Sequence, residues 1–155
     1  MSAFRERAAA LRAQASPHIN CAQAVAVSFA SAAGADEETV MRLAMGFGGG
    51  MRRGAACGAV TGAVMTLGLF GLGDPETLRI FHDRFREKSG GLLDCSELLA
   101  RGASLGLEKK PYCDGLVLLA VDLTEEILKE NGKLPTEDPS AKDADAVIPG
   151  GAVRG

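Results

Sequence analysis

Hydrophobic residues recur at helical spacing along the chain, and no segment alternates between apolar and polar positions with a period of two. After the pair Asp74-Pro75, for example, Leu78, Phe81 and Phe85 fall on one face of a helix. We therefore predict an all-α fold, a single-domain helical bundle of about six to seven helices. The expected helices cover residues 3–14, 17–34, 36–47, 57–70, 95–103 and 111–130, with a further helix that begins at residue 75 and includes Phe85.

Short polar signals mark where several of these helices begin. Ser16-Pro17 is interpreted as an N-cap followed by a first-turn proline, like Asp74-Pro75. Asp94 and Glu97, three residues apart, match a capping box. Asp36, followed by two glutamates, predicts a fourth start, with Val40, Leu43, Ala44 and Phe47 on the buried face.

The end of the chain has a different composition. From residue 131 onward, Pro, Asp, Ala and Gly dominate without periodicity. We therefore divide the chain into a helical redox domain, residues 1–130, and a mobile C-terminal tail, residues 131–155. Truncation at Lys133 is expected to leave the melting temperature nearly unchanged.

One uncharged stretch of twenty residues, 54–73, is long enough to cross a bilayer. It contains Gly58 and Gly62 at the GxxxG spacing found in membrane helices. However, it has six glycines, ends in GLFGLG and has no flanking aromatic belt. We interpret it as the central buried helix of the bundle and expect no membrane association.

Composition narrows the function classes. The chain has 155 residues, 46% hydrophobic and 5% aromatic, so its core is packed mainly from small side chains. A net charge of −3 without a long basic run argues against nucleic-acid binding. Residues 1–16 lack the apolar segment of a signal peptide, so we expect a cytoplasmic, reducing location.

The four cysteines all fall in or near the first two turns of a predicted helix. Helix N-termini present unpaired N–H groups and the positive end of the macrodipole, so we expect lowered cysteine pKa values there. No CxxC pair is present, and any shared site would join four different helices. This placement makes a shared metal or redox site as reasonable as four incidental core cysteines. The positions are Cys21, Cys57, Cys95 and Cys113.

The second of these cysteines lies in GFGGGMRRGAACGAVTG, residues 46–62, in which seven of seventeen residues are glycine. Such a loop can present backbone N–H groups to an anionic cofactor, and Arg52 and Arg53 could compensate its charge. A phosphate cradle is disfavoured because no GxxxxGK[ST] motif and no preceding strand are present. The candidate cofactor-binding glycines are Gly48, Gly49, Gly50, Gly54 and Gly58.

The cysteines and their contexts resemble a family of redox-active proteins named for the pattern C…GCAxxG…C…C. The matching segments are NCAQAV, CGAVTGAVMTLGLFG, DCSELL and YCDGLV, which contain the four cysteines in order. The match departs locally, because Gly58 follows Cys57 instead of preceding it. The family is similar to the non-haem part of split-Soret cytochromes, where such cysteines are associated with an iron–sulfur cluster. The resemblance implies an all-helical fold and a redox role, but no substrate.

Three functions remain open at this point. The first is a small redox protein with a [2Fe–2S] or [4Fe–4S] cluster on the four cysteines, exchanging electrons with a redox partner protein or sensing redox state. The second is a thiol–disulfide redox protein, and the third is a zinc-binding structural module on the same cysteines. A homodimer is compatible with the sequence, which does not show whether the protein has an enzymatic activity of its own.

Overall fold

The computed structural model describes residues 2–135, and its secondary structure is helical, as the sequence predicts. Within the described part of the chain there is no β-strand, only one isolated bridge between Ala56 and Asp94. Two short elements, η1 (Met45–Phe47) and η2 (Gly50–Gly54), lie in the Gly-rich region. The helices are α1 (Ala3–Ala13), α2 (Cys21–Ala30), α3 (Glu37–Leu43), α4 (Gly58–Leu69), α5 (Pro75–Ser89), α6 (Cys95–Ser104) and α7 (Lys109–Glu130).

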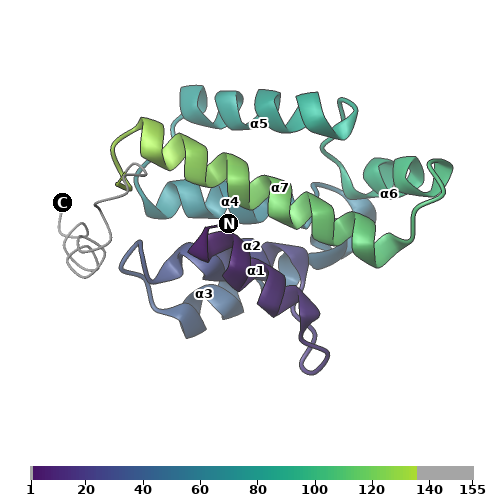
Figure 1. Ribbon diagram of the computed structural model, residues 1–155, viewed down its shortest axis with the longest axis horizontal. Helices are drawn as coiled ribbons and strands as arrows, with labels where there is room; N and C mark the ends of the chain where they lie inside the picture. Colours follow the sequence, from purple (N-terminus) through teal and green to yellow (C-terminus); the bar gives the residue numbers. More distant parts are fainter. Residues whose placement is uncertain (1, 136–155) are drawn as a thin grey trace.

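Helix α7 runs across the molecule and contacts α1, α2, α4, α5 and α6. It passes between α5 on one side and the group α1–α3 on the other, with α4 behind it (Figure 1). The core is built largely from Ala and Val, and Phe29, Phe81 and Phe85 are its largest fully buried side chains. This arrangement brings the first turns of α2, α4, α6 and α7 toward one end of the bundle.

Helix α4 is the predicted central buried helix, and it packs most closely on α2. A Cβ atom on Gly62 would lie 2.7 Å from the Ala22 carbonyl oxygen and 2.9 Å from the Val25 Cβ. The GxxxG spacing therefore serves close packing of two helices within this bundle. No helix in residues 2–135 has the length and apolarity needed to cross a bilayer.

Two of the predicted helix starts are confirmed by hydrogen bonds. The side chain of Asp36 accepts a bond from the Thr39 N–H (2.9 Å), and that of Asp74 accepts one from the Thr77 N–H (3.0 Å). Val40 is buried as expected, whereas Leu43 is 65% exposed. The prediction for Leu43 was wrong because α3 ends at this residue and the chain turns there into η1.

One predicted start was wrong: Ser16 and Pro17 lie in a turn, and α2 begins later, capped by Asn20 in a capping box with Gln23. The predicted start at Asp94 is confirmed, because α6 begins at Cys95 with Asp94 as its N-cap residue. The predicted capping box is absent, since the Asp94 side chain makes no capping bond. Helix α7 begins at Lys109, two residues before the predicted start at Pro111.

The described chain continues five residues beyond α7. The Lys133 N–H donates to the Leu128 carbonyl (2.8 Å), and the half-buried Leu134 packs against the core. These first residues of the predicted tail therefore contact the bundle. The remainder of the predicted tail, residues 136–155, lies outside the described residues.

Candidate functional site

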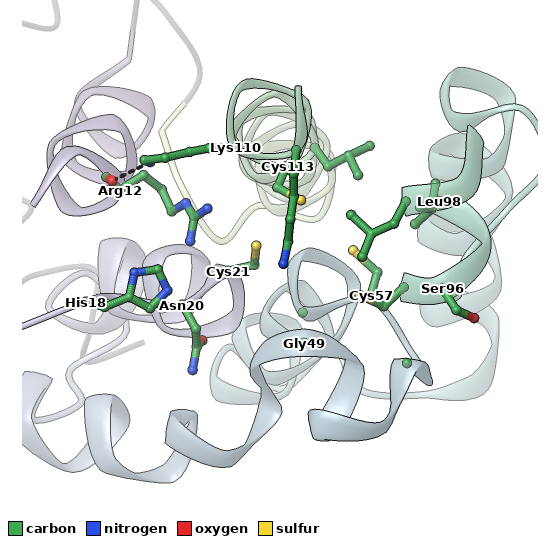
Figure 2. Close-up of a pocket in the computed structure, with 16 residues that line it drawn as sticks. Arg12, His18, Asn20, Cys21, Gly49, Cys57, Ser96, Leu98, Lys110 and Cys113 are labelled. Atoms are coloured by element: carbon green, nitrogen blue, oxygen red, sulfur yellow. Dashed lines mark hydrogen bonds between the residues drawn. The ribbon is translucent and has the colours of Figure 1, made fainter. Parts of the chain in front are cut away.

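All four cysteines line one cavity of about 550 Å³ at the end of the bundle. Cys21 and Cys95 are the first residues of α2 and α6, Cys57 directly precedes α4, and Cys113 lies in the second turn of α7. Figure 2 shows the sulfur atoms of Cys21, Cys57 and Cys113 facing the space between these helices. All four are unbridged thiols, with Cys57 buried and the other three half-buried.

A short backbone pairing joins two of the cysteine segments. The Cys57 N–H donates to the Leu93 carbonyl (2.9 Å), and the Cys95 N–H donates to the Ala55 carbonyl. These bonds flank the Ala56–Asp94 bridge, so the starts of α4 and α6 are held side by side. Because Ala56 and Asp94 are 38 positions apart in the sequence, no local sequence pattern predicts this contact.

Two glycines of the loop explain why the backbone can come so close to the cysteines. A Cβ atom on Gly50 would lie 2.6 Å from the Cys95 Cβ, and one on Gly58 would lie 3.0 Å from the Cys21 Cβ. Any larger residue would displace the cysteine-bearing helices. The dense glycines therefore bring the loop against the starts of α2 and α6.

The predicted cofactor-binding glycines are not all at the cavity surface. Gly49, Gly54 and Gly58 line the cavity. Gly48 packs on the Asn20 side chain instead and lines a neighbouring cavity, and Gly50 is buried behind Cys95. Arg52 and Arg53, expected to compensate charge at the cysteines, also line the neighbouring cavity.

The thiols of Cys21 and Cys113 are hydrogen-bonded to each other. This bond and burial raise the pKa of Cys21 well above its usual value, and Arg12 acts in the opposite direction. The same bond lowers the pKa of Cys113 to about 7, with Arg12 and Lys109 acting in the same direction against burial. The pair therefore loses its first proton near neutral pH.

The other two cysteines have raised pKa values. Burial raises the pKa of Cys57 to about 11, and the backbone N–H groups of Ala59 and Val60 offset only part of this. Burial and the nearby Cys113 raise the pKa of Cys95, with Lys109 opposing. The expectation that helix N-termini lower the cysteine pKa was wrong for Cys21, Cys57 and Cys95. The hydrogen bond to Cys113 is the largest cause of the raised pKa at Cys21. At Cys57 and Cys95 the largest cause is loss of hydration.

The sequence analysis missed the cations around the cavity. Arg12 is buried, and its guanidinium donates to the Asp114 carboxylate (2.6 Å) and the Ile19 carbonyl (2.8 Å). Lys109 and Lys110 also line the cavity, and the Lys110 ammonium donates to the Arg12 carbonyl (2.8 Å; Figure 2). The Lys-Lys pair shortly before Cys113 was an available signal, but nothing in the sequence marks Arg12 as buried.

The remaining lining residues limit what the cavity can hold. Leu98, Leu99 and Leu116 form an apolar wall, and the exposed His18 lies at the opposite side. No three His, Cys, Asp or Glu side chains within residues 2–135 are grouped closely enough to hold one metal ion. The arrangement is thus an open set of four thiols around a cavity, with positive charge nearby.

Comparison with known proteins gives one match. A family model described as "Putative redox-active protein (C_GCAxxG_C_C)" matches residues 19–127, which contain all four cysteines. Searches of the curated proteins and of the solved structures found no match.

Proposed function

Because the chain belongs to the C_GCAxxG_C_C family of redox-active proteins, we propose that its four cysteines hold an iron–sulfur cluster. The observation that carries this proposal is that every cysteine of the chain, each from a different helix, lines the same cavity. The protein would exchange single electrons with a redox partner protein or sense redox state, in the reducing cytoplasm. It would do so as a monomer or as a homodimer.

The donor set and the size of the cavity fit such a cofactor. Four thiolates are the usual ligands of both [2Fe–2S] and [4Fe–4S] clusters. A single tetrahedral zinc ion needs sulfurs about 2.3 Å from one centre, and the described side chains are not grouped in that way. A cavity of about 550 Å³ leaves room for a cofactor of several atoms between the thiols.

The surrounding residues suit an anionic group. When bound, a cluster supplies one-electron chemistry, with a potential set by charge, hydrogen bonds and solvent exposure. Arg12 and Lys109 place positive charge near the cysteines and would favour their deprotonation on binding. Leu98 and Leu116 keep water from one side, and the loop at Gly49 and Gly54 can direct backbone N–H groups toward the cavity.

Anaerobic purification or reconstitution tests the proposal. We expect brown protein with iron and acid-labile sulfide in equal amounts, and a Cys57→Ser variant that loses most of the iron but keeps its helical circular dichroism. A Ser96→Ala variant is the matched control, since Ser96 lines the same cavity and should keep the iron. Colourless protein carrying stoichiometric zinc would contradict the cluster and indicate a structural zinc site on the same cysteines.

A second function is favoured by the hydrogen-bonded thiols of Cys21 and Cys113. A thiolate beside a thiol is the arrangement from which a disulfide forms. The pair would give two electrons and the remaining thiol proton to a disulfide of a partner, which would be reduced to a dithiol. Metal-free protein in which this pair alone forms a reversible disulfide would support the thiol–disulfide function. Mass spectrometry of the trapped disulfide distinguishes it from the cluster.

A further inference from the structure

A second cavity, of about 940 Å³, lies on the other side of the Gly-rich loop. His18, Asn20, Gly49 and Gly54 line both cavities, so the loop forms a shared wall. The rest of the second cavity combines the apolar side chains of Ile19, Met41 and Met45 with Arg52 and Arg53. Neither the family match nor the proposed role of the four cysteines gives this second cavity a function.

The cavity carries positive charge without a matching carboxylate. Its ionisable lining side chains within residues 2–135 are His18, Arg52 and Arg53, and no Asp or Glu lines it. Both arginines are exposed, and neither makes a side-chain hydrogen bond or an ion pair with the described part of the chain.

The polar amides of the cavity are already used within the fold. The side-chain nitrogen of Gln14 donates to the Pro17 carbonyl, and that of Gln23 donates to the Met41 carbonyl (3.2 and 3.0 Å). The Asn20 amide donates to the Met45 carbonyl (3.0 Å). The two guanidinium groups, together with the His18 imidazole, are therefore the side-chain donors of this cavity that the described part of the fold leaves without a partner.

The backbone at one of these arginines is strained. Gly49 and Gly50 have φ values of 62° and 65°, and the left-handed conformation continues through Met51 (61°) and Arg52 (58°). Glycine would adopt this conformation without penalty, whereas it is unfavourable for a residue with a Cβ. The loop therefore holds Arg52 at the cavity in a backbone conformation that glycine would adopt more easily.

We propose that this second cavity binds a small organic anion, with its carboxylate or phosphate held by Arg52 and Arg53 and its apolar body against Ile19, Met41 and Met45. Guanidinium groups bind both oxyanions through charge-assisted, often paired hydrogen bonds. The bound molecule would lie one loop away from the cysteine cavity, as a substrate or effector of the redox centre. The site goes beyond the proposed function, and binding there does not require a cluster.

Calorimetric titration of the full-length, reduced, metal-free protein tests the site with four probes: hexanoate, hexyl phosphate, inorganic phosphate and hexanol. We expect hexanoate or hexyl phosphate to bind more tightly than inorganic phosphate and hexanol, and more weakly as salt is raised. The tighter of the two organic anions identifies the oxyanion. Absence of binding by both, or equal binding of hexanol, would overturn the proposal.

Three single variants connect binding to the arginines. Arg52→Gly and Arg53→Gln should each weaken binding of the organic anion by about tenfold, the value of one hydrogen bond to a charged group. Arg42→Gln is the matched control, since Arg42 is also exposed but does not line the cavity, and it should bind normally. Binding that is the same in all three variants would place the anion elsewhere.

Arg52→Gly also separates the loss of a ligand contact from damage to the fold. Glycine relieves the left-handed strain at this position, so the melting temperature should be unchanged or higher while anion binding falls. A lower melting temperature together with unchanged binding would show that the arginine serves the fold, and the proposed role of Arg52 would be wrong.

Discussion

At the start of α5, Asp74 and Thr77 show how two side chains fix a helix boundary. The Asp74 carboxylate accepts from both the N–H (3.0 Å) and the hydroxyl (2.8 Å) of Thr77, whose side chain is buried. These bonds lower the pKa of Asp74. The ionised carboxylate is therefore favoured by the folded state, and it also faces the positive end of the helix.

Replacing Asp74 by Asn should make the protein less sensitive to acid. The pKa of Asp74 is lower in the folded state than in the unfolded state, where it is near 3.9. The carboxylate therefore stabilises the fold fully at pH values above the unfolded-state pKa. This stabilisation is lost as the pH falls through the folded-state pKa. Asn keeps an acceptor but does not ionise. We expect Asp74→Asn to lower the melting temperature at pH 7 and to match the wild type at pH 2.

The control for this variant is Glu87→Gln, which removes one negative charge from the exposed side of the same helix. Thermal denaturation followed by circular dichroism from pH 7 to pH 2 compares the three proteins. A difference between Asp74→Asn and the wild type that stays constant over this range would contradict the role given to the carboxylate.

Among the helices, the contact between α2 and α4 depends most on the absence of side chains. Gly62 lies against the backbone of Ala22, whereas Gly68, in the last turn of the same helix, has no neighbour within 4 Å of an added Cβ. Gly62 belongs to the GxxxG spacing and Gly68 does not, and the packing of α2 against Gly62 accounts for this difference.

Alanine at the two positions should therefore change stability in opposite directions. Gly62→Ala should lower the free energy of unfolding by about 1–3 kcal/mol, because α2 must move away. Gly68→Ala should raise it by roughly 0.5–1 kcal/mol through helix propensity. Urea denaturation measures both. A Gly62→Ala variant as stable as the wild type, or more stable, would show that α2 and α4 are not in the close contact described.

The helices themselves were predictable because their signals are local. Apolar spacing and the caps at Asp36 and Asp74 depend on residues within one or two turns. Asp94 and Glu97 gave the same kind of signal and marked the start of α6 correctly, although the Asp94 side chain makes no capping bond. At this start the Cys95 N–H donates instead to the carbonyl of Ala55, a partner far away in sequence that no local pattern identifies.

On the scale of the whole molecule, the position of each cysteine near a helix start was predictable from the sequence. The charged residues that surround the cysteine cavity were not. Arg12, nine residues before Cys21, reaches the cavity because α1 packs along α7. The separation of Arg52 and Arg53 from the cysteines follows from the left-handed course of the loop. Both depend on tertiary packing, which periodicity does not encode.

The end of α7 gives a prediction about chain length. A chain that ends at Gly132 loses the half-buried Leu134, so its free energy of unfolding should fall by about 1 kcal/mol. A chain that ends at Pro135 should match the full-length protein, since residues 136–155 lack helical periodicity. Differential scanning calorimetry compares the three. Equal stability of the two shorter chains would mean that Leu134 contributes nothing.

The short pairing between the segments of Cys57 and Cys95 has a thermodynamic consequence. Two backbone bonds hold these cysteine segments side by side, and Gly58 lies close against Cys21. Part of the conformational entropy of gathering the thiols is therefore lost through contacts of the polypeptide itself and not through a ligand. In small zinc domains, by contrast, binding and folding are one event. Contacts of this kind should make affinity at the thiols less tightly coupled to the stability of the fold.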